Sequence, residues 1–214
     1  MRCLTIVFVL LIATSLTAEE GSPNAEEGFV PIFDGRSFHG WEGNLDVFRI
    51  EQGAIVAGSL KNPIARNEFL CTKKEYGDFE LRLSARLVGE GKNAGVQFRS
   101  SRIPNHHEVK GFQCDIGVMK KRPIWGWIYD ESRRRKFLAE ANDDELSKHL
   151  RPDGWNDITI RCQGPKISIT VNGYVTAEYT ETEAGIADRG IIGLQIHSGP
   201  PAEAWYKNIR IKEL

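Results

Sequence analysis

Three segments of the sequence carry side chains capable of chemistry at every second position. These side chains alternate with apolar residues, and they are Gln97 and Arg99, Gln113 and Asp115, and Gln195 and His197. Residues two apart in a β-strand point to the same side of a sheet. Because Phe98, Cys114 and Ile196 suit a core, we expect the six functional side chains to leave from the opposite face.

Such a set of side chains matches the surface of a sugar. Amide, carboxylate and guanidinium groups make oriented hydrogen bonds with hydroxyl groups. Aromatic rings supply an apolar platform for a pyranose, and Trp125, Trp127 and Tyr129 also alternate, which predicts that all three face one way. The alternative is a face that is merely solvated, since any half-exposed antiparallel sheet alternates in polarity.

The segment that starts at Tyr129 is rich in charge and runs to Lys136. It is interpreted either as an exposed loop or as the rim of a pocket, with Glu131 and either Arg133 or Arg134 reaching a bound ligand. The sequence contains no Ser-His-Asp order with a nucleophile elbow and no Gly-rich phosphate loop.

A neighbouring pair, His106 and His107, is the one arrangement that suggests a metal ligand set. Adjacent residues on an extended chain point apart and therefore chelate poorly. We expect two loop histidines and no metal site.

Alternation of apolar and polar residues also predicts the strands that position these side chains. The longest pattern runs from Phe79 to Leu87, and further strands are expected at 190–197 and 206–212. The segment from Phe48 to Ile55 is predicted to form a hairpin that turns at Gln52-Gly53.

The clearest pattern lies between 155 and 179. Three short strands are separated by turns at Gln163-Gly164-Pro165 and at Asn172-Gly173, where both residues tolerate a positive φ. The best helix candidate is Asp143 to Leu150, one or two turns long. With 21 glycines and frequent turns, these patterns predict an all-β, two-sheet antiparallel sandwich.

The composition is that of one soluble globular domain. The chain has 214 residues, 28 basic and 29 acidic, and a net charge of -1. Near-neutrality gives no electrostatic reason to expect nucleic acid or an anionic membrane as a partner.

The first residues are typical of a secretory signal. Arg2 precedes an apolar run from Leu4 to Ile12, which is too short to span a bilayer, and small residues follow it. We predict a signal peptide at 1–18, a flexible lead-in at 19–28 and one domain at 29–214. The protein is then periplasmic or secreted, without a stable membrane span after cleavage; the alternative is an uncleaved N-terminal anchor.

Removing the signal leaves three cysteines, Cys71, Cys114 and Cys162. An odd number is not a disulfide framework, and no two of them have the C-x-x-C spacing of a zinc cluster. Each lies within an apolar alternating run, so we expect three small buried residues.

Seven short motifs occur in an order that resembles one family. They are Phe33–Ser37 with Gly40-Trp41, Tyr76–Leu81, Asn93–Arg99, Gly111–Asp115, Trp155–Gly173, Gly193–His197 and Tyr206–Ile211. In this order the chain resembles the 3-keto-disaccharide hydrolase domain family, from about residue 29 to 214. The resemblance implies a concanavalin A-like jelly roll and, for some members, cleavage of glycosides oxidised at C3. A structural calcium is compatible with this fold, but the sequence contains no ligand cluster that identifies one, and we predict no cofactor.

Cleavage of a 3-keto-glycoside needs three groups. A base removes the acidified proton from C2, a donor stabilises the enolate oxygen at C3, and an acid protonates the leaving group at C1. We expect His197 as the base, Asp115 as its orienting partner or as the base itself, Arg99 at the enolate and Tyr129 as the acid. An ordinary glycosidase needs two flanking carboxylates, of which the predicted face supplies only Asp115 unless Glu131 reaches in.

A second class of function remains open, a non-catalytic carbohydrate-binding module with the same fold. A binder needs the aromatic platform and the amides, but it needs no base. Either class takes a carbohydrate as its partner.

Overall fold

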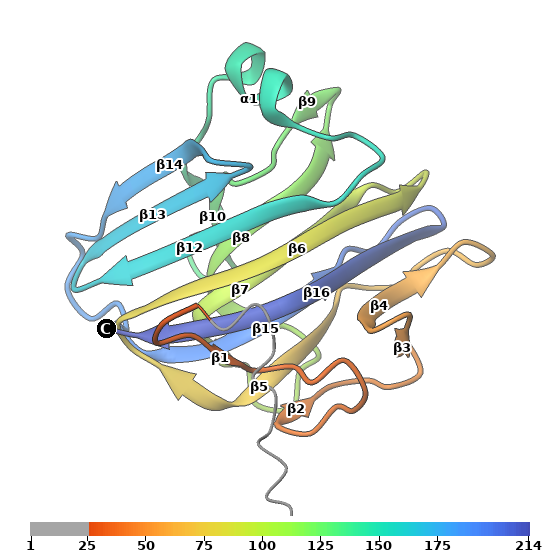
Figure 1. Ribbon diagram of the computed structural model, residues 1–214, viewed down its shortest axis with the longest axis horizontal. Helices are drawn as coiled ribbons and strands as arrows, with labels where there is room; N and C mark the ends of the chain where they lie inside the picture. The colour runs from red at the N-terminus through yellow and green to blue at the C-terminus, as the bar shows by residue number, and fades with distance from the viewer. Residues whose placement is uncertain (1–25) are drawn as a thin grey trace, which may run out of the picture.

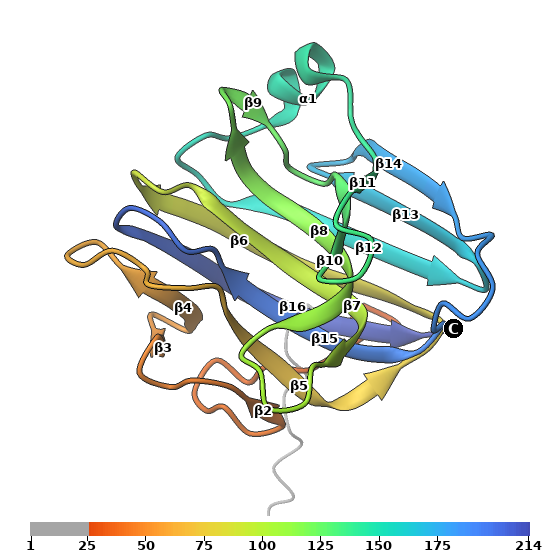
Figure 2. The same ribbon diagram turned by 180° about the vertical axis from the view of Figure 1, so that it is seen from behind.

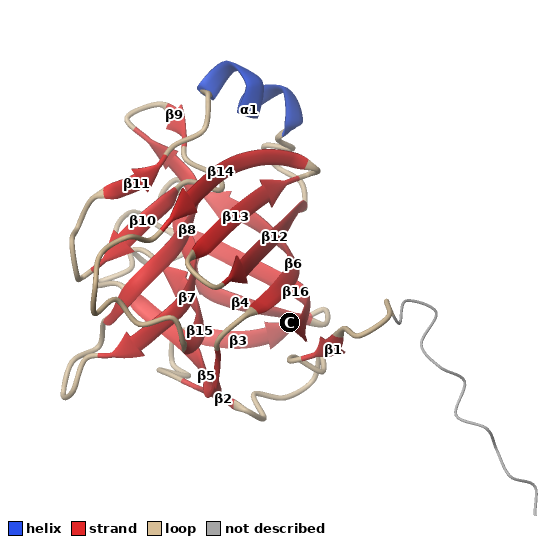
Figure 3. Ribbon diagram, turned by 90° about the vertical axis from the view of Figure 1, so that its left-hand side faces the viewer, coloured by secondary structure: helices blue, strands red, loops and turns tan. Residues whose placement is uncertain are grey.

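Alternating apolar residues build two antiparallel sheets that pack face to face (Figure 3). The computed structural model describes residues 26–214, so the predicted signal peptide and most of the lead-in lie outside the described residues. Figure 1 looks onto the layer called here the front sheet, and Figure 2 looks from behind onto the back sheet. The predicted two-sheet sandwich is confirmed.

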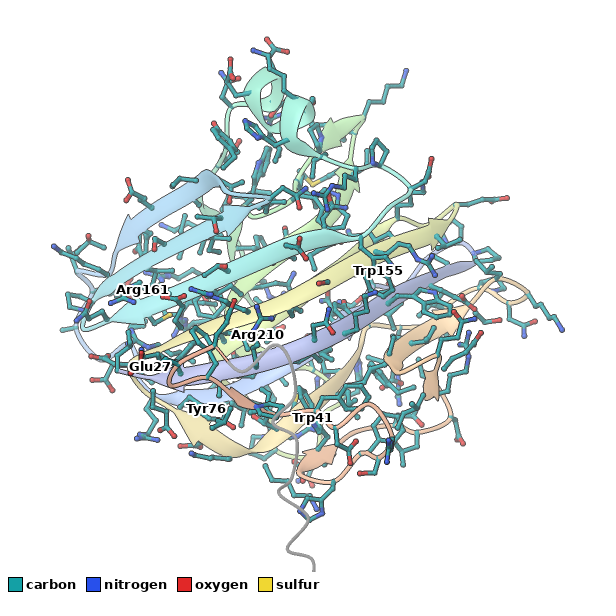
Figure 4. All side chains as sticks on the ribbon, viewed as in Figure 1. Glu27, Trp41, Tyr76, Trp155, Arg161 and Arg210 are labelled. Carbon is teal, nitrogen blue, oxygen red and sulfur yellow. The ribbon has the colours of Figure 1, made fainter. Side chains whose placement is uncertain are left out.

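The front sheet has eight strands. In order across the sheet they are β14 (Tyr174–Thr180), β13 (Lys166–Val171), β12 (Asn156–Gln163), β6 (Phe79–Gly89), β16 (Ala202–Glu213), β4 (Ala54–Ser59) and β3 (Phe48–Glu51), with β1 (Val30–Pro31) beside β16. Charged side chains such as Arg161 and Arg210 project from its outer face (Figure 4).

The back sheet also has eight strands. In order they are β11 (Phe137–Ala139), β10 (Ile128–Glu131), β8 (Val109–Met119), β7 (Asn93–Arg102), β15 (Gly190–Ile196), β5 (Glu68–Tyr76) and β2 (Trp41–Glu42), with β9 (Arg122–Pro123) beside β8. The three strands predicted to carry functional residues, β8, β7 and β15, are therefore neighbours.

One short helix, α1 (Asp143–His149), lies at one end of the sandwich, as predicted (Figure 1). The side chain of Asn142 caps it by accepting a hydrogen bond from the backbone N–H of Glu145. Acidic residues in the first turn and basic residues in the last turn match the helix dipole. Within residues 26–214, no helix is long and apolar enough to cross a membrane.

The core lies between the two sheets and follows the predicted alternation. Leu81 and Ile160 face inward from the front sheet, and Phe98, Cys114 and Ile196 face inward from the back sheet, all nearly inaccessible to solvent. Burying a large apolar side chain of this kind contributes about 1.5–3 kcal/mol. This packing fixes the position of the back sheet and therefore of the side chains on its outer face.

The three described cysteines are free and buried, as predicted. Burial raises the pKa of Cys71 and of Cys162 to about 12, so both thiols stay protonated. Cys71 packs with Phe69, Val109 and Ile191 in a small cluster separate from the main core.

The predicted hairpin turns are also confirmed. Asn172 and Gly173, between β13 and β14, have φ of 50° and 83°, and Gln52 and Gly53, between β3 and β4, have φ of 52° and 72°. A two-residue turn with positive φ at both positions matches the twist of the paired strands.

Replacing Gly173 with Val is expected to destabilise the protein by about 1–2 kcal/mol, because a β-branched residue resists a positive φ. A Cβ at this position would meet nothing within 4 Å, so the loss is conformational and not steric. Thermal or denaturant unfolding measures it. The control Gly173→Asn, whose side chain tolerates this conformation, should lose less; equal losses in the two variants would contradict the argument.

Candidate functional site

A pocket of about 320 Å³ opens on the outer face of the back sheet, the face turned away from the core. Its size lies at the lower end of the range for ligand pockets, about 300–1,000 Å³. Its lining comes from four strands of the back sheet and from the connections next to them, and comprises Asn67, Asn93, Gln113, Asp115, Met119, Ile124, Tyr129, Glu131, Phe137 and His197.

Strand register brings the polar lining together. Tyr129 of β10 lies directly opposite Gln113 of β8, which lies opposite Gln97 of β7. Residues opposite each other in an antiparallel ladder point to the same side of the sheet. These three side chains therefore form one row across the outer face.

The next row is Asp115 of β8, Gly95 of β7 and Gln195 of β15. The glycine leaves a gap in the row, and the side chain of Gln113 lies over it. A Cβ at Gly95 would come within 2.5 Å of Cδ of Gln113. The missing side chain thus lets Gln113 reach sideways to Asp115, and its Nε2 donates a hydrogen bond to Oδ1 of that residue.

Asp115 is the most perturbed carboxyl group of the pocket. Its side chain is almost fully buried, 5% exposed. Burial raises the pKa of Asp115 to about 7, and the charge of Glu131 adds to the rise, while the hydrogen bond from Gln113 opposes it. A carboxyl group that titrates near neutrality is suited to proton transfer.

This shift has a measurable effect on stability. The native state binds the Asp115 proton more tightly than the unfolded state, so this group lowers stability as the pH rises from about 4 to about 7. We expect the Asp115→Asn variant to lack this loss. Its free energy of unfolding should therefore exceed that of the wild type by a margin that grows with pH and reaches up to about 4 kcal/mol at pH 8. Denaturant unfolding of both proteins at pH 4 and pH 8 measures it, and a difference that does not grow with pH would contradict the shift.

Glu131 ends β10, and its carboxyl group contacts the side chains of Ser132 and Gln195. Ser132 Oγ lies 3.2 Å from its Oε1 and donates to Oε2 of Glu108 at 2.5 Å, and Gln195 Nε2 lies 3.4 Å from its Oε2. Burial and the charge of Glu108 raise the pKa of Glu131, and His197 partly offsets the rise. Glu131 therefore favours its protonated form more than an exposed glutamate does.

His197 directly follows β15. Its Nδ1 lies 2.7 Å from the carbonyl oxygen of Ser198. Because a carbonyl oxygen only accepts, Nδ1 carries the proton and Nε2 of the neutral ring is left as an acceptor. Asn67 holds this turn, since its Oδ1 accepts from the backbone N–H of Ser198 at 2.9 Å.

One wall of the pocket is apolar. It consists of Met119, Ile124 and the ring of Phe137, which lies 5.1 Å from the ring of Tyr129 between centroids. Trp127 supports Phe137 from the core side in an edge-to-face contact at 5.1 Å. An apolar wall opposite carboxylates and amides matches a pyranose, which has apolar ring faces and polar edges.

Five of the twelve residues predicted for a site line this pocket: Gln113, Asp115, Tyr129, Glu131 and His197. Gln97 and Gln195 are on the predicted face, but both are fully buried and contact other side chains. They lie behind the lining and do not form part of it.

The prediction that Arg99 faces this pocket is wrong. Pairing between β7 and β8 shifts between Phe98 and Ser101, and Arg99 has φ of 46°, so a β-bulge breaks the alternation there. The guanidinium instead bonds the carbonyl oxygen of Gly164 and Oδ1 of Asp78, each at 2.7 Å. It joins two turns, one between β12 and β13 and one between β5 and β6.

The predicted tryptophan platform is also wrong. Trp125 and Gly126 form a turn, so 125–129 is not one continuous strand, and Trp125 and Trp127 are both buried in the main core. Only Tyr129, in β10, reaches the pocket.

Neither Arg133 nor Arg134 reaches the pocket. Both bond the carboxylate of Asp130, a fully buried residue that points to the opposite side of β10 from Glu131, and Arg134 also bonds Glu181. The prediction that one of them contacts a ligand is wrong because the buried Asp130 attracts both. Of the two roles expected for Asp115, orienting His197 is not the one that the hydrogen bonds support, because Nδ1 of His197 bonds the carbonyl oxygen of Ser198 and Oδ1 of Asp115 bonds Gln113.

The two loop histidines lie between β7 and β8, as predicted. Their rings do not point apart, as the extended-chain argument expected; they stack with centroids 4.4 Å apart because the chain turns there. Nδ1 of His107 bonds the carbonyl oxygen of Asn67 at 3.0 Å. Among residues 26–214, no group of three or more His, Cys, Asp or Glu side chains is placed to hold a metal ion.

The sequence reasoning missed five lining residues, Asn67, Asn93, Met119, Ile124 and Phe137. A signal existed for Asn93, because it stands two and four residues before Gly95 and Gln97 and so shares their face. Ile124 and Phe137 depend on how the segments after β8 fold back, for which the local pattern gave no signal.

Two packed antiparallel sheets with a polar pocket on the outer face of one of them define a jelly roll with a candidate binding site. A profile of the 3-keto-alpha-glucoside-1,2-lyase-like domain matches residues 28–212. The chain belongs to this family, as the sequence motifs predicted, and membership indicates a carbohydrate-related function. None of the curated proteins compared with the chain matches it.

Solved structures share the fold. Two proteins from Parabacteroides distasonis ATCC 8503, each proposed to be a glycosyl hydrolase, superpose with TM-scores of 0.65 and 0.63 at 18% and 22% identity; the first match covers 88% of this chain and 94% of the other, the second 87% and 99%. The carbohydrate-binding module CBM66 from Bacillus subtilis superposes with a TM-score of 0.62 at 13% identity, over 81% of this chain and 96% of that one. At these identities the likeness shows the fold alone, and it agrees with the predicted jelly roll.

Proposed function

We propose that this protein cleaves 3-keto-glycosides by removing the proton from C2 and eliminating the substituent at C1, after which water adds to the product. The observation that carries the proposal is Asp115, a buried carboxyl group with a pKa near neutrality in a pocket that also holds Glu131 and His197. Family membership supports the same reaction class. We also propose that the protein is exported to the periplasm or secreted, on the evidence of its N-terminal sequence.

The C3 ketone makes the C2 proton acidic. Asp115 accepts this proton through Oδ2, since Gln113 occupies Oδ1. The C2–H electron pair forms the C1–C2 double bond as the C1–O bond breaks. Glu131, whose raised pKa favours the acid form, gives its proton to the departing oxygen.

Negative charge develops on the C3 oxygen during this step. Arg99 lies elsewhere, so a neutral donor must stabilise that oxygen. Burial raises the pKa of Tyr129, which keeps its hydroxyl protonated and able to donate. His197, with a free Nε2, accepts a proton from the water that then adds its oxygen to C1. Asp115 releases the proton it removed to the solvent, and C2 takes up a proton from solvent water.

The second candidate is the non-catalytic binding module. The pocket would serve such a module through Gln113, Asn67 and Asn93. It lacks two of the three rings of the aromatic platform expected for a binder, because Trp125 and Trp127 are buried and only Tyr129 lines the pocket. A buried carboxyl group with a pKa near 7 also has no role in a simple binder, so the observations favour the enzyme.

The test compares two substrates with one chromogenic leaving group. The purified mature protein is incubated with 4-nitrophenyl 3-keto-glucoside and with the unoxidised glucoside, and release of nitrophenol is followed. We expect turnover of the ketone only. Equal turnover of both would indicate an ordinary two-carboxylate glycosidase, and binding without turnover would indicate a binding module; either result contradicts the proposal.

The charge of the pocket predicts a preference among glycones. Among the described lining residues none is Lys or Arg, while Asp115 and Glu131 are acidic. A carboxylate on the sugar would therefore meet like charges without a counter-ion. We expect kcat/KM for a 3-keto-glucuronide to be at least about tenfold lower than for the matching 3-keto-glucoside, with the gap widening as the pH rises. A faster uronide would contradict this expectation.

A further inference from the structure

Behind the pocket, four side chains form a continuous chain of hydrogen bonds that ends at Asp115. Ser100 Oγ donates to Oε1 of Gln97 at 2.9 Å, Nε2 of Gln97 donates to Oε1 of Gln113, and Nε2 of Gln113 donates to Oδ1 of Asp115. Ser100 and Gln97 are 2% and 0% exposed, and neither lines the pocket. The chain therefore reaches Asp115 from inside the sheet.

The carboxylate of Asp115 determines which group donates and which accepts in each hydrogen bond of this series. An ionised carboxylate only accepts hydrogen bonds, so Gln113 must present its NH₂ group to Asp115 and its carbonyl to Gln97. Gln97 must then present its own carbonyl to the far end of the chain. Ser100 places a hydroxyl donor there: its Oγ lies 2.9 Å from Oε1 of Gln97, nearer than the carbonyl oxygens of Phe98 at 3.0 Å and Phe112 at 3.3 Å. Reversing the chain to accept a proton from Oδ1 would require both amides to turn over.

The sheet makes room for this chain at two glycines. A Cβ at Gly95 would lie 2.5 Å from Cδ of Gln113, and a Cβ at Gly111 would lie 2.3 Å from Oγ of Ser100. The β-bulge that turns Arg99 away also brings Ser100 onto the face that carries Gln97. The backbone of β7 and β8 thus provides the space for the four side chains and places the hydroxyl of Ser100 at the far end of the hydrogen-bond chain.

We propose that Ser100 and Gln97 are positioning residues that hold Nε2 of Gln113 on Oδ1 of Asp115 and leave Oδ2 as the oxygen that takes up a proton. The proposal rests on the proposed function insofar as Asp115 is the base. Glu131 and Tyr129 of β10 and His197 after β15 line the same pocket and act on the carboxyl group from the open side. The hydrogen-bond chain acts from the closed side and stabilises the ionised form.

The experiment measures the ionisation of Asp115 directly and needs no turnover. Protein carrying ¹³C in its Asp carboxyl groups is titrated by NMR, and Asp115 is assigned with Asp115→Asn. We expect Ser100→Ala to raise the pKa of Asp115 by about one pH unit, because Gln97 loses its fixed direction and Gln113 no longer donates steadily. The matched control is Ser101→Ala, the exposed next residue of the same strand, which should leave the titration unchanged.

A second variant, Gln97→Met, keeps the length of the side chain but removes the amide, and it carries the test if Ser100→Ala does not fold. An unchanged pKa of Asp115 in the folded variants would overturn the proposal, as would an equal shift in Ser101→Ala. In an active enzyme the acidic limb of kcat/KM should move to higher pH with the same shift. Absence of turnover in the wild type would refute the proposed function and leave the NMR result to decide the positioning role.

Discussion

In the Asp115→Asn variant we expect kcat on a 3-keto-glucoside to fall by about 10³-fold, while the affinity for the substrate changes little. Asparagine keeps the shape of the side chain and can still accept the hydrogen bond from Gln113, but it cannot take up the C2 proton. General-base catalysis typically contributes about 10²–10⁴-fold. Single-turnover kinetics and equilibrium binding separate the two effects.

The matched control is Asp188→Asn, which makes the same change at an exposed position outside the pocket. It should leave kcat unchanged. A loss of less than about tenfold in Asp115→Asn would show that another group takes the proton. His197, whose Nε2 is free, would then be the next candidate.

The second large effect is expected for Glu131→Gln, and its size should depend on the leaving group. Glutamine cannot protonate the departing oxygen. A nitrophenolate leaves without such help, whereas the alkoxide of a methyl glycoside needs it, so we expect a loss of about 10²-fold or more for the methyl 3-keto-glucoside and a much smaller one for the nitrophenyl compound.

Glu90→Gln, an exposed substitution in the bend that follows β6 and outside the pocket lining, is the control and should affect turnover of neither substrate. Equal losses with the two leaving groups would contradict the role of Glu131 as the acid. In that case the hydroxyl of Tyr129 would remain as the donor to the leaving oxygen, as its place in the pocket allows.

Alternation of residue types was enough to predict the sandwich, because the local pattern directly reflects which face of a strand is buried. The register of β12 with β13, and the turn at Asn172-Gly173, follow from residues close together in the sequence. The same reasoning placed Gln113 and Asp115 on one face correctly.

It failed where the backbone departs from a regular strand. A β-bulge at Arg99 turns that side chain toward Asp78. The alternation of Val96 and Phe98 does not predict this bulge. Likewise the turn at Trp125 and Gly126 ends an apparent alternation. Both irregularities depend on pairing with distant strands, so a local pattern cannot predict them.

The effect of Glu108, whose charge raises the pKa of Glu131, could not be predicted from the sequence either. Glu108 comes from the loop between β7 and β8 and meets Glu131 only through the hydroxyl of Ser132, after β10 has paired with β8. Contacts of this kind depend on the path of a loop across a folded sheet, which sequence spacing does not encode.

If cleavage starts by removal of the proton at C2, the hydrogen on that carbon is lost in every turnover. The most direct measurement uses a 3-keto-glucoside that carries deuterium at C2 and compares, in a single turnover, the leaving group released with the deuterium lost to water. We expect one deuterium to be lost for every leaving group released, beyond the exchange seen without protein. Release of the leaving group with the deuterium still at C2 would show that cleavage does not begin with removal of the C2 proton.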